Sequence, residues 1–331
     1  MLRLTALAAL ILAMFTLPAL AQPLPGQRQV DTGLHSSRAA VAPGETFTIV
    51  LRETINEGWH TYWRNPGDSG EATTLQWQLP PGWRAGDIQW PPPEAVPFAM
   101  LVNYGYEGEV LFPVEVTAPA SARVGASVTL TAEADWLVCS DICIPESATL
   151  TLTVPVEAQG RDDLQWAPRV AEALANVPRR AAGVTATITA GSPARLSVAL
   201  PDADQVRNPR FFPFDRDVMA NAEAQSPRVG ASGVSFSLSP GIRNTFGQTA
   251  LDGVVVFERR QGGAWVHRGV EISAQPGEPI AGTDGAAAPI SNDYSLRDLE
   301  SGGAGPAPAA QSLSFAALLV AIGLAFVLAG V

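Results

Sequence analysis

Short β-forming stretches, separated by proline- and glycine-rich turns, dominate residues 44–156. No strong amphipathic helix interrupts them, and turn sequences such as Asn-Pro-Gly-Asp at 65–68 lie between them. This pattern favours an antiparallel β-sandwich over an alternating α/β fold. The clearest stretches alternate apolar and polar residues or carry β-branched side chains, and they lie at 46–51, 110–116, 128–132 and 149–154.

A second strand-rich region follows at residues 181–275, after the clearest helix candidate of the chain at 163–176. We therefore predict a mainly β protein with two immunoglobulin-like antiparallel β-sandwich modules. The first module covers residues 22–157, a helical connector covers 158–180, and the second module covers 181–275. Because the second module has no cysteine, we expect it to support or orient the first.

The two ends of the chain differ from these modules in composition. Arg3, an apolar run and a small-residue Ala-Leu-Ala motif predict a secretory signal peptide at residues 1–21. Glycine, proline, alanine and serine dominate residues 276–311, which we expect to be a flexible linker. Residues 312–331 are uncharged and almost wholly apolar, which predicts the start of a transmembrane helix. We expect a fragment of a larger membrane protein, cut inside its first spanning helix.

The charge balance excludes several classes of function. The formal net charge is −11, which disfavours nucleic acid as a partner, because nucleic-acid binding needs clustered cations. All basic residues are arginines, so a Schiff-base lysine and a Walker-type lysine are both absent. Imidazole chemistry is limited to His35, His60 and His267.

Only two cysteines are present, Cys139 and Cys143. Closing a ring of ~5 residues stabilises a fold by roughly 2 kcal/mol, against roughly 4.7 kcal/mol for a ring of ~100 residues. A pair that adds so little stability is a candidate redox couple or metal clip. An exported chain works where thiols tend to oxidise.

Acidic residues surround the pair in the sequence at Asp135, Asp141 and Glu146. Carboxylates close to a thiol raise its pKa and disfavour the thiolate that exchange requires. We therefore predict a pair that is slow toward random oxidants and reacts mainly within a docked complex.

Three other interpretations of these residues are open. The disulfide could be inert and structural. Cys139 and Cys143 could bind Cu(I), with His60, Met100 or His267 completing the site, because thiolates and thioethers are soft ligands. The chain could also be a protein- or carbohydrate-binding sandwich without redox chemistry. That last interpretation rests on the tryptophans of the first module, Trp59, Trp63, Trp77, Trp83, Trp90 and Trp136.

The segment 136–146, which holds both cysteines, resembles the active-site segment of the periplasmic N-terminal region of DsbD-type thiol:disulfide interchange proteins. It is closer to the branch called suppressor of copper sensitivity protein B. Segments 58–70 and 103–108 agree with this resemblance, which covers residues 42–156 well and the second module more loosely. The family implies an immunoglobulin-like sandwich that takes electrons from a membrane domain and passes them to periplasmic oxidoreductases.

The resemblance also implies a location and partners. The chain would be periplasmic and anchored to the inner membrane by its C-terminal segment. Its partners would be periplasmic thioredoxin-like proteins and a membrane electron-transfer domain, in the same chain or supplied separately. It would need no cofactor besides its redox-active disulfide, although the branch leaves copper open.

Roles for single residues follow from the resemblance as well. Cys143 would be the sulfur attacked in mixed disulfides, and Cys139 would resolve them. The loop with Tyr104 and Tyr106 matches the position of a cap that shields the pair. Tyr62 and Trp136 are further candidates for shielding. Three residues separate the cysteines here, whereas the best-known DsbD members have five.

Overall fold

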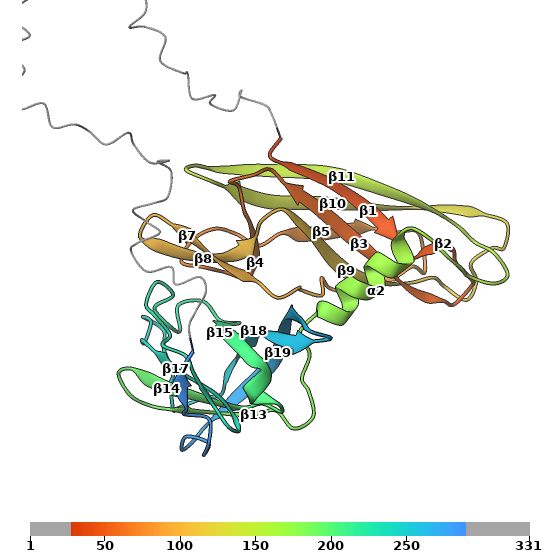
Figure 1. Ribbon diagram of the computed structural model, residues 1–331. Coiled ribbons are helices and arrows are strands. Elements are labelled where there is room, and N and C mark those ends of the chain that lie inside the picture. Colours follow the sequence, from red (N-terminus) through yellow and green to blue (C-terminus); the bar gives the residue numbers. More distant parts are fainter. Residues whose placement is uncertain (1–27, 289–331) are drawn as a thin grey trace, which may run out of the picture. The chain divides into compact units, whose positions relative to one another are not determined.

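The computed structural model of the chain describes residues 28–288, which form a mainly β protein (Figure 1). The strands make several sheets whose pairings are almost all antiparallel, which confirms the predicted class. The expected signal peptide and transmembrane segment lie outside the described residues. Within residues 28–288, no helix is both long and apolar enough to cross a membrane.

Four sheets make up the N-terminal part, which we define as residues 28–162. One has the order β1 (Val30–Ser36), β3 (Thr46–Ile55), β9 (Glu109–Thr117) and β6 (Arg84–Ala85). A second has the order β11 (Cys143–Pro155), β10 (Ser127–Cys139) and β5 (Thr74–Gln78). The third has the order β4 (Thr61–Gly67), β8 (Leu101–Tyr106) and β7 (Glu94–Phe98), and the fourth pairs β2 (Arg38–Ala40) with β12 (Arg161–Asp162).

Alternation in the sequence explains the core of this part. In β10 every second residue from Leu130 to Val138 is buried, because successive side chains of a strand point to opposite faces. β3 and β9 contribute a matching set of apolar residues. The buried side chains of these three strands include Ile49, Leu51, Phe112, Val114, Leu130 and Ala132.

A single eight-stranded sheet forms most of the C-terminal part, which we define as residues 178–288. Its strands are β15 (Val206–Pro213), β18 (Leu251–Gln261), β19 (Ala264–Pro276), β13 (Thr185–Thr189), β14 (Ala194–Ala199), β17 (Gly233–Leu238), β16 (Arg228–Gly230) and β20 (Ala286–Ala287). β13 and β19 run parallel. β20 lies within the range expected to be linker, and it pairs with β16.

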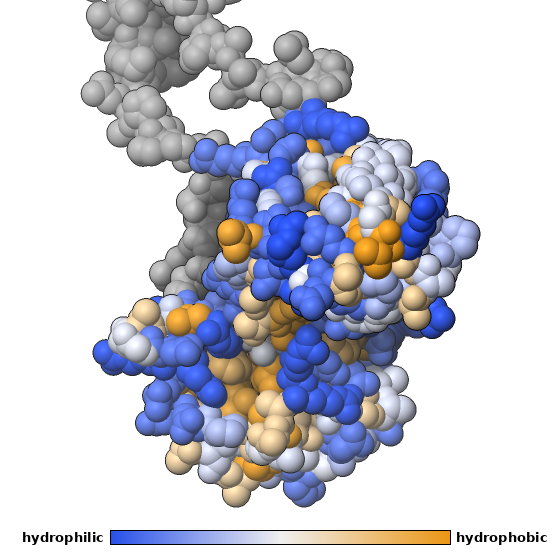
Figure 2. All heavy atoms as spheres, turned by 90° about the vertical axis from the view of Figure 1, so that its right-hand side faces the viewer, coloured by the Kyte–Doolittle hydropathy of each residue, from blue (hydrophilic) through white to orange (hydrophobic). Residues whose placement is uncertain are grey.

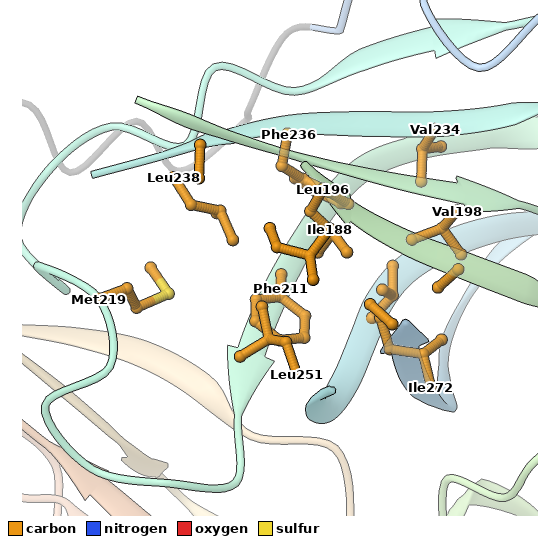
Figure 3. Packing of buried hydrophobic residues seen from close by; sticks show 14 of the residues in the cluster. Ile188, Leu196, Val198, Phe211, Met219, Val234, Phe236, Leu238, Leu251 and Ile272 are labelled. Atoms are coloured by element: carbon orange, nitrogen blue, oxygen red, sulfur yellow. The ribbon is translucent and has the colours of Figure 1, made fainter. Parts of the chain in front are cut away.

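The core of the C-terminal part is a separate apolar cluster (Figure 3). Its side chains come from strands far apart in the sequence, such as Ile188 on β13, Phe211 on β15 and Phe236 on β17. All three are almost completely buried. Each such side chain stabilises the fold by roughly 1.5–3 kcal/mol when it is buried and not exposed to water.

The helix α2 (Trp166–Asn176) joins the two parts, in the region where the sequence predicts a helix. Asp163 starts it, because its carboxylate accepts hydrogen bonds from the backbone amides of Gln165 and Trp166 at 2.9 and 2.8 Å. Val170 is its buried residue. A further short element, the 3₁₀ helix η1 (Ala203–Gln205), precedes β15.

Hydrophilic residues cover most of the upper half of the face seen in Figure 2, whereas hydrophobic side chains gather in the middle of its lower half. Isolated apolar side chains are normal on a protein surface, whereas a group of them marks an interaction site. The large hydrophobic residues that are exposed among the described ones are Met100, Leu101, Val124, Ile142, Leu164, Ile242 and Trp265.

Candidate redox site

The two cysteines form a disulfide across the end of a long hairpin. Cys139 is the last residue of β10, Cys143 is the first residue of β11, and the two face each other in the strand register. Their sulfurs are bonded, with a Cα–Cα distance of 4.1 Å. Cys139 is completely buried, whereas Cys143 is exposed. A nucleophile from another protein therefore reaches the residue Cys143 more easily than Cys139.

The backbone of Cys139 is held from both sides. His60 donates its backbone amide to the Cys139 carbonyl at 2.9 Å, and the Cys139 amide donates to the His60 carbonyl at 3.0 Å. These bonds join the end of β10 to the segment that leads into β4. The backbone of Cys139 is thus bonded to that segment, whereas Cys143 follows the turn and begins β11.

Tyr62 on β4 contacts the sulfur of Cys143. Its hydroxyl oxygen is 3.9 Å from Cys143 Sγ, and the hydroxyl must be the donor, because a disulfide sulfur carries no hydrogen. Burial raises the pKa of Tyr62 to about 12, so the hydroxyl keeps its proton. It can therefore also donate to the Cys143 thiolate that forms when the disulfide opens.

Asn103 on β8 connects Tyr62 with His60. Its side-chain amide donates to the Tyr62 hydroxyl at 3.4 Å and lies 3.2 Å from His60 Nε2. Burial lowers the pKa of His60 to about 4, so its imidazole is neutral at physiological pH. A neutral ring can accept the amide hydrogen at Nε2.

The other three residues predicted to shield the pair have different partners. The Tyr104 hydroxyl donates to Asn221 Oδ1 at 2.8 Å, and the Tyr106 hydroxyl donates to the Pro91 carbonyl at 2.9 Å. Trp136 donates its ring N–H to Glu146 at 3.3 Å. All three are buried. The structure brings Tyr62 to Cys143, and shielding by the others stays a prediction.

Apolar side chains lie in the turn between the cysteines and in the turn between β7 and β8. The ring of Phe98, at the turn between β7 and β8, is 6.2 Å from the ring of His60. The next residues of this turn, Met100 and Leu101, are 83% and 39% exposed. Ile142, in the turn between the cysteines, is 61% exposed. An exposed apolar residue between the polar residues of the cysteine turn was the available signal for Ile142.

The acidic neighbours of the cysteines do not act as one group. Glu146 accepts hydrogen bonds from the backbone amides of Gln29 and Val30 at 2.7 and 3.3 Å, in addition to the one from Trp136. Asp135 pairs with Ser147 further along the hairpin. Asp141 lies exposed in the turn between the cysteines. Of the three, only Asp141 shares that turn.

Comparison with known proteins agrees with this geometry. Residues 32–155 match the family model described as "Thiol:disulfide interchange protein DsbD, N-terminal". This segment is a DsbD N-terminal domain. It contains both cysteines, Tyr62, Asn103 and the β7–β8 turn, so the resemblance expected from the sequence is confirmed there. No curated protein sequence matches the chain.

One solved structure extends the likeness of fold beyond the DsbD N-terminal domain. The N-terminal periplasmic domain of ScsB from Proteus mirabilis matches with a TM-score of 0.51 and 19% identity, over 77% of this chain and 97% of that chain. At this identity the match shows the fold. The yeast GGA1 GAE domain matches with a TM-score of 0.22 and 13% identity, over 39% of this chain and 95% of that chain.

A pocket of about 380 Å³ lies along the hairpin of the DsbD N-terminal domain. Leu137 and Pro145, which pair across the hairpin, are among its lining residues. They lie on the same face as the disulfide, because residues two apart on a strand share a face. The remaining lining residues are Glu71, Ala72, Thr74, Asp135, Trp136, Glu146 and Ser147.

A buried acid lies behind the site in the DsbD N-terminal domain. The carboxylate of Glu53 on β3 is completely buried and accepts hydrogen bonds from the hydroxyls of Thr61 and Thr73 at 2.8 and 3.0 Å. Burial raises its pKa to about 7, and the nearby charge of Glu146 acts in the same direction. No sequence pattern predicted this buried acid, because a glutamate in a half-apolar strand usually faces solvent.

The residues of the copper hypothesis lie in different settings. His60 uses Nε2 toward Asn103, Met100 lies in the exposed β7–β8 turn, and His267 lies on β19 of the C-terminal part. Within residues 28–288, no group of three or more His, Cys, Asp or Glu side chains is arranged to hold a metal ion. Copper binding stays a hypothesis.

Proposed function

We propose that Cys139 and Cys143 are a dithiol–disulfide couple that passes electrons from a membrane reductase system to periplasmic thioredoxin-like proteins. Two immunoglobulin-like sandwiches would carry the couple, held at the inner membrane by the C-terminal segment. The observation that carries this proposal is the disulfide of the DsbD N-terminal domain, which lies in a hairpin turn with one exposed and one buried cysteine.

The reaction consists of two thiol–disulfide exchanges. In the first, the Cys143 thiolate of the reduced pair attacks a disulfide sulfur of the partner, a mixed disulfide forms, and one partner sulfur leaves as a thiolate. In the second, the Cys139 thiolate attacks Cys143 Sγ, and the other partner sulfur leaves. The pair is oxidised and the partner is reduced by two electrons. The membrane system restores the dithiol by the reverse exchanges.

The asymmetry of the pair supports these roles. An exposed residue is needed at the position that bonds to another protein, and Cys143 meets that need. The resolving sulfur acts only inside the mixed disulfide, so it can come from a buried residue such as Cys139. The Tyr62 hydroxyl, 3.9 Å from Cys143 Sγ, supports the thiolate at the position that attacks.

Side chains around the disulfide favour a protein partner over a small thiol. Ile142, in the turn between the cysteines, is an exposed apolar residue, and such a residue loses unfavourable contact with water when a partner covers it. The pocket at Leu137 and Pro145 continues the same face of the hairpin. We propose that the partner's segment next to its reactive cysteine lies along this pocket.

Trapping of the mixed disulfide tests the proposal. With Cys139→Ala, we expect a stable disulfide between Cys143 and a periplasmic thioredoxin-like protein, because no cysteine remains to resolve it. With Cys143→Ala, we expect no such complex, which makes it the matched control. Non-reducing gel electrophoresis followed by mass spectrometry measures both. Equal trapping by both variants, or none by either, would contradict the assignment.

The unfolding free energies of the oxidised and the reduced protein distinguish a redox-active disulfide from a structural one. Opening a ring of ~5 residues is expected to cost roughly 2 kcal/mol of unfolding free energy, so the reduced protein should stay folded. Urea denaturation with and without a dithiol reductant measures the difference. A global unfolding on reduction would show that the disulfide is structural.

A further inference from the structure

A segment of the C-terminal part lies against the DsbD N-terminal domain close to the redox site. The described residues fall in one compact unit, and residues 213–221, which begin at the last residue of β15, contact the end of β4 and the loop after it. Asn65 donates its side-chain amide to the carbonyls of Pro213 and Asp215 at 2.8 and 3.2 Å. The ring of Phe212, just before this segment, is 4.9 Å from the ring of Tyr104.

Asn221 in this segment bonds to two elements of the DsbD N-terminal domain. Its amide nitrogen donates to Asp68 Oδ1 at 2.8 Å, and its amide oxygen accepts from the Tyr104 hydroxyl at 2.8 Å. Asn221 is 4% exposed, and its bond with Tyr104 is buried, whereas Asp68 is exposed. Removing Asn221 therefore costs more than one ordinary hydrogen bond, because the buried Tyr104 hydroxyl loses its partner without gaining water.

Arg216 holds the same loop at its other end. Its guanidinium donates to the Gly70 carbonyl at 3.2 Å and lies 3.8 Å from the Glu71 carboxylate. The loop 68–71 is therefore bonded from the C-terminal part at Asp68, at Gly70 and at Glu71.

This loop packs directly on Tyr62. Gly70 has a φ of +94°, and a Cβ added there would lie 2.1 Å from Cε1 of the Tyr62 ring. Ser69 fixes the neighbouring residue, because its hydroxyl donates to Asn103 Oδ1 at 2.8 Å, and Asn103 in turn donates to the Tyr62 hydroxyl. A shift of the loop would therefore move the Tyr62 ring or its hydroxyl.

We propose that Asn221 and Arg216 are positioning residues for exchange at Cys143: they hold the loop 68–71 against Tyr62, which places the Tyr62 hydroxyl at the Cys143 sulfur. The inference deepens the proposed function and rests on it. It gives the C-terminal part, which has no cysteine, a defined role in the reactivity of the pair.

Alkylation of a single thiol tests the inference without any partner protein. In the full chain with Cys139→Ala, Cys143 is the only thiol, and its alkylation rate against pH reports how much thiolate is present. Burial lowers the pKa of His60 to about 4 and raises that of Tyr62 to about 12, so both lie outside the range in which a thiol titrates. The charged neighbour in the turn, Asp141, is unchanged in every variant.

Tyr62→Phe removes the hydroxyl and is expected to lower the alkylation rate near neutral pH roughly fivefold, since one hydrogen bond is worth about 1 kcal/mol. Asn221→Ala should reproduce this loss, and it should add little in the Tyr62→Phe background, because both changes act through the same hydroxyl. Asn244→Ala is the matched control, since Asn244 is exposed and its side chain, among residues 28–288, bonds within its own turn to the Gly241 carbonyl.

Two outcomes would overturn the inference. One is an Asn221→Ala variant that is less stable in urea but has the alkylation profile of its parent. The other is full additivity of Asn221→Ala and Tyr62→Phe. If Asn221→Ala does not fold, Arg216→Ala provides the same test, because the Arg216 side chain is 42% exposed and its loss leaves the buried contacts intact. A chain that shows these shifts but traps no partner would refute the proposed function and not this inference.

Discussion

Between pH 4.5 and pH 8, the unfolding free energy of Glu53→Gln is expected to rise by about 3 kcal/mol relative to that of the unchanged protein. Burial raises the pKa of Glu53 from 4.5 to about 7 in the folded state. Between these values the unfolded chain releases the proton and the folded chain keeps it. The stability that the proton supports is complete below the unfolded pKa and is lost as the pH rises through the folded pKa. Glutamine has no proton to release, so the variant avoids this loss.

The contribution of His60 to the unfolding free energy changes with pH in the opposite direction, so Glu53→Gln reveals an effect that Glu53 otherwise offsets. Burial lowers the pKa of His60 from 6.5 to about 4, so the unfolded chain binds a proton that the folded chain does not. Stability from His60 therefore rises with pH between about 4 and 6.5. In the unchanged protein, the fall in unfolding free energy due to Glu53 and the rise due to His60 nearly cancel over most of this pH range. Of these two effects, Glu53→Gln keeps the rise due to His60.

Urea denaturation at several pH values between about 4.5 and 8 measures both curves. The exposed Glu223→Gln is the matched control, and it should follow the unchanged protein at every pH. Parallel curves for Glu53→Gln and the unchanged protein would show that Glu53 is not a buried acid with a raised pKa.

Gly105→Ala is expected to lower the unfolding free energy by about 3 kcal/mol and to slow exchange at Cys143. Gly105 lies on β8, opposite Tyr62 of β4. A Cβ at this position would lie 1.9 Å from the Thr61 carbonyl oxygen, which belongs to the backbone and cannot rotate away. The added methyl group must therefore separate β8 from β4, and Tyr62 moves with β4.

Gly86→Ala is the matched control for this change. Its nearest neighbour for an added Cβ is the Glu115 carbonyl at 3.8 Å, an ordinary van der Waals distance. We expect its stability to stay within about 0.5 kcal/mol of the unchanged protein. Thermal or urea denaturation compares the two variants. A Gly105→Ala protein as stable as Gly86→Ala would mean that β4 and β8 are not packed as closely as described.

Periodicity predicted the strands of the DsbD N-terminal domain well. The stretch 46–51 lies within β3, 110–116 lies within β9, and 128–132 lies within β10. Alternating burial depends only on neighbours along the chain, so a sequence reports it directly. The lengths of the strands were harder to predict from the sequence. β10 and β11 each have 13 residues, because they pair with each other beyond the stretches that alternate most clearly.

The candidate site was predicted less completely than the strands. Both cysteines and Tyr62 were found from the sequence, whereas Glu53, Phe98 and Asn103 were not. Tyr104 shows why. Its position in the chain suggested contact with the cysteines, but its hydroxyl bonds to Asn221, which lies 117 residues away in the sequence. Side-chain contacts of this kind follow from packing between distant elements, and no local pattern encodes them.

The four-position spacing of the two cysteines is enough to predict that they lie within reach of each other at a turn, because so short a segment can hardly separate them. Which cysteine is exposed, and which side chain contacts its sulfur, depends on the packing of distant strands. Cys139 is buried because the segment before β4 pairs with its backbone, and Cys143 meets Tyr62 across 81 positions of sequence. The spacing of residues sets local reach, whereas burial and long-range contact depend on how the sheets pack.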